Sequence, residues 1–379
     1  MSITVNQKPD NNSPAYNDLN FVISESSGAI YGSPNFKYLC DVYNSTTLLA
    51  RLKAPIYPNS TNKGVFNISR LIENFVTYDW NIDDISVSGC PNSNFYYNVK
   101  FGYEYSTGST SPMITSSGLT NVTGLTAYNM ALHPIDFVAF DENDYKINTS
   151  TNARFLTTMR SKTIHRTQKD WLYFWKGNAS AVTIKTYPAA TTQTITLTGI
   201  LDDILRIPII PSSGATYLEV KAIGSGSTSE TYLIYIKDEC SKYDTNDIYF
   251  LNRYGAVESF RFDRLRRDKF AVARKQYKST PYTLSGSSYT YGTDAKSKSN
   301  YYTEANQIIT LNSNWITEEE STWLKELIMS PYVWMLDGGV LKSINVINSE
   351  YETKRTINDK VFNLTIDVEL SFTDKVQRL

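Results

Sequence analysis

The sequence predicts a mainly β fold, built from β-sandwich-like modules and a C-terminal β-sheet domain that carries one helix. Short segments of alternating polar and apolar residues recur along the chain, divided by clusters of Gly, Pro, Asn and Ser. Tyr accounts for 28 of 379 residues, and aromatic residues favour strands. No segment repeats at a fixed period of about 20–50 residues, which argues against a solenoid or a propeller.

Three domains are expected, because 379 residues is two to three times the length of a common domain. The first, residues 1–107, is predicted to be a β-sandwich-like domain. Asn35–Tyr43 alternates, and Phe95–Tyr105 supplies a long aromatic strand. Between these strands one helix is predicted after Asn67, which is of a residue type that caps helices. The helix is indicated by apolar residues at i, i+3, i+4 and i+7: Ile68, Leu71, Ile72 and Phe75.

The middle domain, residues 108–245, is predicted to be β-rich. It opens with a connector rich in Ser, Thr and Gly, residues 109–124. Trp171–Trp175 is an intensely aromatic strand with rings on both faces, whereas a sugar-binding platform needs only one exposed face. We therefore predict that this strand belongs to a core or an interface. Further strands are predicted over residues 181–187, 192–197, 217–223 and 231–236.

The third domain, residues 246–379, is predicted to be an α+β sheet domain with a basic stripe and a long arm. Thr317 and Glu320 have the spacing of a capping box that opens a helix. Asp337–Gly339 reads as a tight turn between two strands, and Val361–Leu370 alternates along its whole length. The predicted helix would bury Trp323, Leu324, Leu327 and Ile328.

Composition excludes several classes of protein. The formal charge of −1 does not suit a protein that coats nucleic acid, which needs a basic excess. The first ten residues lack the apolar core of a signal peptide, and no stretch approaches the roughly 18 apolar residues of a membrane span. Cys40, Cys90 and Cys240 are odd in number and far apart, so neither a disulfide framework nor a zinc site is predicted.

No catalytic pattern is visible, and we predict that the chain is not an enzyme and has no cofactor or metal. His133 and His165 have no nucleophile beside them in the sequence. The acidic segment 141–144 lacks the spacing of a calcium loop and is read as a solvated turn. No phosphate-binding or dinucleotide-binding loop appears. A triad assembled from distant residues stays open, because its members need not be adjacent.

A basic stripe is the strongest charge feature. Arg261–Lys278 holds eight basic and two acidic residues, so the stripe carries +6 and the remainder −7. Interleaved aromatic residues favour a pair of strands whose outward basic residues meet acidic residues of a neighbouring subunit; contact with nucleic acid is the alternative. Residues 279–306, rich in Ser, Tyr and Gly, are predicted to form a long loop or extended arm. The candidate interface residues are Arg261, Arg264, Arg266, Arg267, Lys269, Arg274, Lys275, Tyr289, Tyr291, Tyr301 and Tyr302.

The chain also resembles a known group of proteins. Asp247–Phe262 is similar to a segment with Trp or Phe, then L-N-R-x-G-x-x-x-x-F-x-F, in virion structural proteins of tailed phages, especially the tail ring proteins of crAss-like podoviruses of Bacteroidota. The rest of the resemblance lies in Asn20–Val22, Phe36–Tyr38, Val65–Ile72, Tyr332–Trp334, Val346–Arg355, Asn358–Asp359 and Asn363–Thr365.

The resemblance implies a structural subunit of a phage tail, made in the host cytoplasm and located in the virion. Such subunits form an oligomeric ring, expected to be six- or twelvefold, around the DNA channel. The implied partners are other copies of the chain, other phage tail proteins and, transiently, genomic double-stranded DNA. The alternative is a receptor- or glycan-binding tail or baseplate protein that stacks sugars on Trp171 and Trp175. A hydrolase acting on host polysaccharide ranks third.

Overall fold

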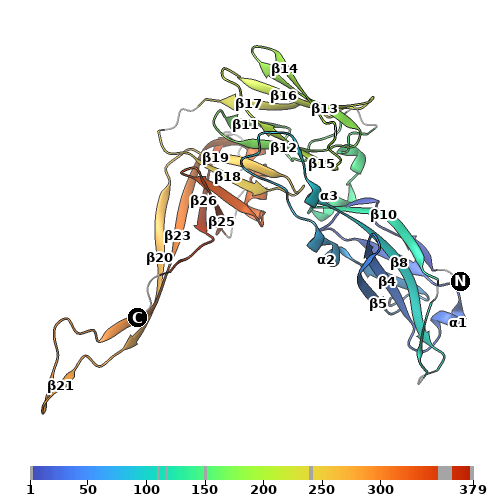
Figure 1. The fold of residues 1–379 in the computed structure, drawn as a ribbon, viewed down its shortest axis with the longest axis horizontal. Coiled ribbons are helices and arrows are strands. Elements are labelled where there is room, and N and C mark those ends of the chain that lie inside the picture. Colours follow the sequence, from blue (N-terminus) through green and yellow to red (C-terminus); the bar gives the residue numbers. More distant parts are fainter. Residues whose placement is uncertain are drawn as a thin grey trace. The chain divides into compact units, whose positions relative to one another are not determined.

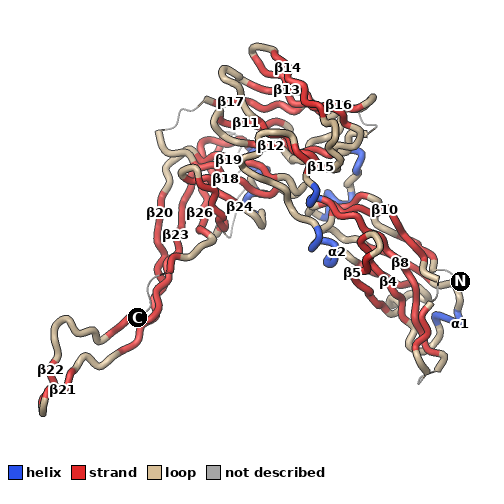
Figure 2. The backbone as a smooth tube through the Cα atoms, in the orientation of Figure 1, coloured by secondary structure: helices blue, strands red, loops and turns tan. Residues whose placement is uncertain are grey.

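The chain is mainly β, which confirms the predicted fold class (Figures 1 and 2). The computed structural model describes residues 3–108, 111–116, 118–148, 152–238, 242–348 and 361–375. The chain divides into two compact units where the sequence predicts three domains. Unit 1 comprises Met1–Lys237 with Leu251–Glu258, and unit 2 comprises Asp238–Phe250 with Ser259–Leu379.

The first core of unit 1 contains side chains from two sheets, as in a β-sandwich. One sheet has the order β1-β3-β6; the other has the order β2-β10-β8-β4-β5, with β9 paired to β8. The rings of Phe21 and Phe101, one from each sheet, lie 5.3 Å apart. The strands are β1 (Thr4–Gln7), β2 (Asn12–Pro14), β3 (Asn20–Ser24), β4 (Lys37–Asn44), β5 (Thr47–Ala54), β6 (Lys63–Asn67), β8 (Asn94–Ser106), β9 (Met113–Thr115) and β10 (Thr120–Tyr128).

This first sandwich extends beyond the predicted boundary at residue 107. β10 pairs with β8 from Thr120 to Tyr128, and Leu125 and Ala127 lie in the first core. Part of the expected connector is therefore a strand, because Thr suits a pleated surface even when its polar neighbours suggest a loop. The short helices of unit 1 are α1 (Gly28–Tyr31), α2 (Ser69–Ile72), η1 (Glu73–Phe75), η2 (Pro91–Ser93), α3 (Pro134–Val138) and η3 (Glu142–Asp144).

The helix predicted after Asn67 is shorter than its apolar spacing indicates. α2 begins at Ser69, whose backbone N–H donates to the Asn67 side-chain oxygen at 3.1 Å. After one turn the chain tightens into the 3₁₀ helix η1. Asn67 therefore satisfies a backbone N–H at the first turn, as the sequence suggests, although the position that flanks the helix is Ile68.

The second core of unit 1 also contains side chains from two sheets, with the orders β11-β17-β16-β13-β14 and β12-β15-β7. Every residue of β12 is buried. Leu172 and Phe174 face this core. On the opposite face the Trp175 ring lies 4.2 Å from that of Tyr128, which confirms that the aromatic strand belongs to the core. The strands are β7 (Ser88–Gly89), β11 (Ser161–His165), β12 (Asp170–Trp175), β13 (Ala179–Tyr187), β14 (Thr191–Thr196), β15 (Ile204–Ile209), β16 (Tyr217–Gly224) and β17 (Tyr232–Lys237).

The Asn-Arg-Tyr-Gly segment of the phage-like pattern forms a tight turn in unit 1. The Asn252 side-chain oxygen accepts hydrogen bonds from the backbone N–H groups of Tyr254 (2.9 Å) and Ala256 (3.0 Å). Gly255 has φ +76°, and a Cβ there would lie 2.0 Å from the carbonyl oxygen of Asn129. Glycine is required at this position both by backbone conformation and by space.

Unit 2 is built on one sheet with the order β19-β18-β24-β25-β26-β23-β20, and β27 pairs with β23. Its strands are β18 (Asn246–Leu251), β19 (Val257–Phe262), β20 (Arg267–Lys278), β23 (Lys298–Thr317), β24 (Val333–Asp337), β25 (Val340–Val346), β26 (Val361–Leu370) and β27 (Asp374–Lys375). A separate pair, β21 (Thr283–Ser285) and β22 (Ser288–Thr290), lies between β20 and β23 in the sequence. The helical segment is split into α4 (Glu318–Trp323) and α5 (Lys325–Met329).

Local signals in unit 2 are confirmed. Thr317 and Glu320 form the reciprocal capping box, with bonds of 2.8 and 3.2 Å. Gly338 and Gly339 both have positive φ, as expected for the two central residues of a hairpin turn between β24 and β25. Of the four residues predicted to be buried by the helix, Ile328 is only half-buried.

Cys40 and Cys90 are buried, and burial raises the pKa of both thiols. Cys240 and the 349–359 part of the phage-like resemblance lie outside the described residues. Among the residues that the structure describes, no helix is long and apolar enough to cross a membrane.

Candidate interaction surface

A two-stranded ribbon is the main candidate surface of unit 2. β20 pairs with β23 from Arg267 opposite Thr310 to Lys278 opposite Lys298. β23 also pairs with β26, but only from Ile308 onward, and with β27 at residues 304 and 305. The pair therefore continues beyond the sheet, with β21 and β22 at its far end (Figures 1 and 2). We call residues 267–310 the ribbon; the predicted arm is thus largely β-structure.

Apolar side chains on the ribbon are exposed. Every residue of β20 is exposed, including Phe270 at 61% and Tyr277 at 49%. A two-stranded hairpin that packs on nothing is marginally stable in water. Exposed rings and aliphatic groups on such a hairpin leave apolar area that a partner surface can cover.

Three Tyr side chains cluster at the far end of the ribbon. The ring of Tyr282 lies 6.4 Å from that of Tyr289 and 5.4 Å from that of Tyr291. Each of the three remains more than half exposed, from 52% to 75%. Tyr is enriched at the buried centres of protein interfaces, where it supplies large area with few rotatable bonds.

The ribbon is basic. It contains seven basic and three acidic residues, a net charge of +4. Because the whole chain carries −1, the other residues carry −5 (−1 minus +4). Lys275 on β20 lies 5.4 Å from the ring of Tyr302 on β23, so a cation and an aromatic ring from the predicted set are brought together.

Arg261 does not belong to the exposed stripe, contrary to the prediction. Its guanidinium makes two hydrogen bonds to the carboxylate of Asp247, of 2.6 and 2.8 Å, and its side chain is only 4% exposed. It lies on β19, inside unit 2. The count of basic residues in the sequence does not distinguish an ion pair that closes inside the fold from a charge that faces solvent.

Arg266 is also engaged within unit 2. It pairs with Asp268 at 2.7 Å and with Asp337 at 2.9 Å. Burial lowers its pKa, but the hydrogen bonds to these carboxylates outweigh burial and raise the pKa. A hydrogen bond from Lys342, together with Arg266, holds the pKa of Asp337 below its ordinary value. These contacts tie the start of the ribbon to β24 and β25.

The other predicted interface residues are exposed or half-buried. Tyr302 is half-buried and donates to Glu304 at 2.6 Å. Arg264 and Arg267 lie at the base of the ribbon, and the others lie along it. The exposed members are Arg264, Arg267, Lys269, Arg274, Lys275, Tyr289, Tyr291 and Tyr301.

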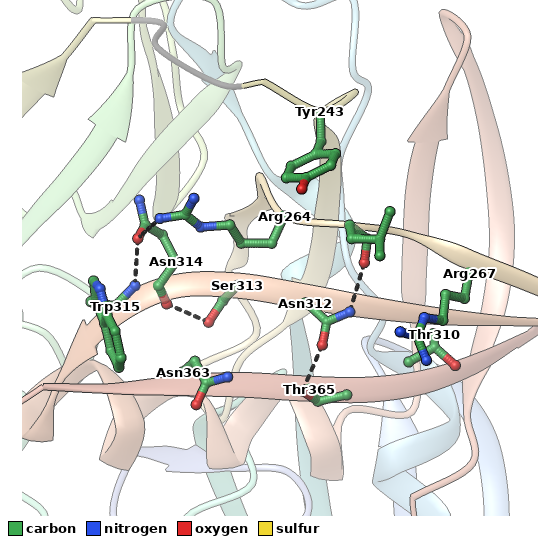
Figure 3. Close-up of a pocket in the computed structure, with 11 residues that line it drawn as sticks. Tyr243, Arg264, Arg267, Thr310, Asn312, Ser313, Asn314, Trp315, Asn363 and Thr365 are labelled. Atoms are coloured by element: carbon green, nitrogen blue, oxygen red, sulfur yellow. Dashed lines mark hydrogen bonds between the residues drawn. The ribbon is translucent and has the colours of Figure 1, made fainter.

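Sequence reasoning missed one exposed aromatic residue at the base of the ribbon. Trp315 lies in a shallow pocket of about 570 Å³, which we call the Trp315 pocket. The only sequence signal was the polar run of residues 312–314, which interrupts an apolar alternation. The pocket is lined by Tyr243, Arg264, Leu265, Arg267, Thr310, Asn312, Ser313, Asn314, Trp315, Asn363 and Thr365 (Figure 3).

Two of the residues weighed for catalysis or metal binding, His133 and Asp141, have local structural partners. The His133 side chain accepts from the backbone N–H of Ile135 and caps α3. Asp141 caps η3 by accepting from the backbone N–H of Asn143 at 2.9 Å. Within the described ranges, no group of three His, Cys, Asp or Glu side chains is placed to hold a metal ion. The absence of enzyme activity stays a prediction.

Comparison with known proteins does not identify a family for the chain. No family model and no curated protein matches the chain. Among solved structures, the chicken CNTN1 FN1-FN3 domains share 10% identity over 82% of this chain and 91% of that chain, with a TM-score of 0.21. A bacterial ice-binding adhesin shares 6% identity over 82% and 92%, with a TM-score of 0.19. Likenesses this weak carry no argument about function.

Proposed function

We propose that this chain is a structural subunit of a phage tail and assembles into a homo-oligomeric ring through the ribbon. One observation carries the proposal: a long two-stranded ribbon exposes aromatic and basic side chains beyond the sheet that supports it. The phage-like sequence pattern then supplies the class of assembly. In an oligomer a neighbouring subunit can cover the exposed apolar area of the ribbon, whereas in a monomer this area stays in contact with water.

The proposed occupant of the ribbon surface is a second copy of the chain. In a ring, each interface joins two different faces of identical subunits. The ribbon carries +4 and the remaining residues −5, so one copy presents both signs of charge that such an interface needs. Electrostatic complementarity of this kind favours the correct register and accelerates association.

Aromatic burial would supply most of the binding energy. An exposed ion pair contributes only about 0–1 kcal/mol. Full burial of a large apolar side chain contributes about 1.5–3 kcal/mol. Three Tyr side chains at the tip, and Phe270 and Tyr277 along β20, therefore outweigh the charges if a neighbour covers them. Salt should weaken the ring modestly, because screening acts on the charges alone.

The ring model includes contacts that the sequence resemblance implies. The ring, six- or twelvefold, would enclose the DNA channel in the virion tail and contact other tail proteins, with passing contact to genomic DNA. Glycan binding by Trp171 and Trp175 loses its support, because these side chains are 3% and 0% exposed. The remaining rival for the ribbon is DNA, since a basic surface with aromatic rings suits phosphates and bases as well.

Charge reversal on the ribbon distinguishes subunit contact from DNA binding. In the variant Lys269→Glu/Arg274→Glu/Lys275→Glu all three positions are exposed, so the fold should be kept. The control Lys37→Glu/Lys63→Glu/Arg70→Glu changes the net charge equally at exposed positions of unit 1. Sedimentation velocity at low salt should show a loss of oligomer in the ribbon variant and a wild-type oligomer in the control.

DNA affinity is measured on the same proteins by fluorescence anisotropy. If DNA is the partner, the ribbon variant keeps its oligomers and loses a salt-sensitive affinity for duplex DNA. That result, or an unchanged oligomer without any change in DNA binding, would refute the subunit-contact proposal.

A further inference from the structure

Trp315 differs from every other Trp of the chain. Of the six Trp residues it alone is exposed, at 65%, whereas the others are buried or half-buried. It lies on β23 in the part that pairs with β26, at the base of the ribbon. An exposed indole on a well-supported sheet is a rigid, flat apolar surface, held by strands and not by a loop.

A β-bulge places Trp315 on the outer face. On β23, Leu311 and Ser313 point inward, and the next buried residue is Ile316, so the alternation shifts by one residue. The register agrees: Asn312 pairs with Thr365 and Trp315 with Asn363, which leaves two residues of β23 opposite one of β26. Bulges of this kind redirect side chains and are frequent at functional sites.

Hydrogen bonds hold the bulge rigid. The Asn314 side-chain oxygen accepts from Arg264 at 2.7 Å and from the backbone N–H of Trp315 at 2.8 Å (Figure 3). Its amide donates to Asp263 at 3.3 Å. The Ser313 hydroxyl accepts from the backbone N–H of Leu364 at 2.8 Å. Both residues of the bulge are therefore anchored, and the pocket exists before any ligand arrives.

The groups left to meet a ligand are mainly donors. Within the described residues, the side chains of Arg267 and Asn363 make no hydrogen bond or ion pair, and Arg264 uses one of its two terminal nitrogens on Asn314. None of the lining residues is Asp or Glu. Two guanidinium groups without a lining carboxylate suit an anion, and the fork of an Arg suits a carboxylate in particular.

We propose that the Trp315 pocket binds an acidic saccharide, a pyranose that carries a carboxylate. The apolar C–H face of the ring would stack on the indole of Trp315. The two guanidinium groups lie on opposite sides of Asn312, Arg264 toward Trp315 and Arg267 beside Thr310 (Figure 3). The carboxylate of the sugar on Trp315 would pair with Arg264, and that of a neighbouring sugar unit with Arg267. Ring hydroxyls would bond the carboxamide of Asn363 and the hydroxyl of Thr365. The volume of about 570 Å³ is in the range of small-ligand sites.

Saccharide fits this pocket better than nucleic acid. Sugar hydroxyls both donate and accept, which matches an amide and hydroxyls beside the Arg groups, whereas phosphates only accept. Nucleic-acid channels stack successive bases on several aromatic rings, whereas the lining here has two aromatic residues, Trp315 and Tyr243, among mainly polar side chains. The site shares Arg267 and Thr310 with the base of the ribbon but leaves the exposed rings of the ribbon unused, so it does not depend on the proposed ring function.

Isothermal titration calorimetry of the full chain tests the proposal, with tetragalacturonate as the acidic probe and maltotetraose as the neutral one. Tetragalacturonate should bind, and maltotetraose should bind roughly tenfold or more weakly, because it lacks the charge-assisted hydrogen bonds. Trp315→Ala should weaken tetragalacturonate binding by roughly tenfold or more through the loss of stacking. Phe372→Ala is the matched control, since it removes a side chain that is 83% exposed elsewhere in unit 2.

Two further variants define the site. Arg267→Gln should reduce the preference for the acidic over the neutral probe, because Arg264 remains. Trp315→Phe keeps a ring and guards against misfolding of the Ala variant: it should bind with intermediate affinity. Wild-type binding should shift the fluorescence of Trp315, and this shift should be absent in Trp315→Phe.

Three results would overturn the proposal: no binding of tetragalacturonate, equal binding by wild type and Trp315→Ala, or tighter Trp315-dependent binding of oligothymidylate. The last would assign the pocket to single-stranded nucleic acid. Sedimentation of Trp315→Ala keeps this test separate from the proposed function, because the variant should still form the wild-type oligomer.

Discussion

β12 and the ribbon are both rich in aromatic residues, yet their environments are opposite. In β12 every residue is buried, and the rings of Trp171 and Trp175 pack edge-on or tilted against Trp80 and Tyr128. Along β20 every residue is exposed, and the tip Tyr residues contact mainly one another. The sequence predicts strands for β12 and for residues 261–278 but a loop or extended arm for residues 279–306. The layers that cover a strand decide whether its rings stabilise the monomer or remain available for a partner.

The largest expected difference between β12 and the ribbon is the effect of alanine substitution on the free energy of unfolding. Trp175→Ala should cost about 3–5 kcal/mol of the free energy of unfolding, because it leaves a cavity at a side chain that is 0% exposed. Tyr289→Ala, at 75% exposure, should change it by no more than about 0.5 kcal/mol. Urea unfolding followed by circular dichroism measures both. Equal costs at the two positions would mean that the ribbon is packed in the free subunit.

The basic residues also divide into a buried group, such as Arg261, and an exposed group, such as Arg274. Asp247→Ala should cost about 3 kcal/mol, because it leaves the guanidinium of Arg261 buried without its main partner. The double variant Asp247→Leu/Arg261→Met should regain much of that loss. Arg274→Ala on the exposed ribbon should have almost no effect on unfolding. If Asp247→Ala lowered the free energy of unfolding only slightly, Arg261 would be a solvent-facing charge and not part of a buried ion pair.

A smaller effect, which depends on pH, is expected where the ribbon joins the sheet. Hydrogen bonds from Lys342 and Arg266 lower the pKa of Asp337 in the folded state below its unfolded value. Ionised Asp337 therefore contributes its full stabilisation of the fold above its unfolded pKa, roughly 3.9. This contribution is lost as the pH falls through the folded pKa of Asp337.

Asp337→Asn should consequently lower stability by about 1 kcal/mol near neutral pH. The difference from wild type should shrink below about pH 4. Asp294→Asn, at an exposed carboxylate of the ribbon, serves as control. A difference that grows as the solution is acidified would contradict the assigned direction of the shift.

The success of sequence reasoning depended on the range of the interaction. Local signals predicted well: the capping box at Thr317 and the Asp337–Gly339 turn depend on a few neighbouring residues. The continuation of the first sandwich into β10 and the burial of Arg261 depend on pairing with distant strands, which one sequence does not display. The Trp315 bulge is a shift in register between β23 and β26, and so it is visible only when both strands are placed.

Shortening the ribbon tests the central claim, that the chain assembles through it, most directly. Residues 271–306 would be replaced by Asn-Gly, a two-residue hairpin turn, between Phe270 and Gln307, which are opposite each other in β20 and β23. The bonds of Arg266 and the Trp315 pocket are left in place. Sedimentation velocity should show that the shortened chain is a folded monomer with the wild-type melting transition, whereas the account predicts a ring for the intact chain. A shortened chain that sediments as the wild-type oligomer would contradict the account.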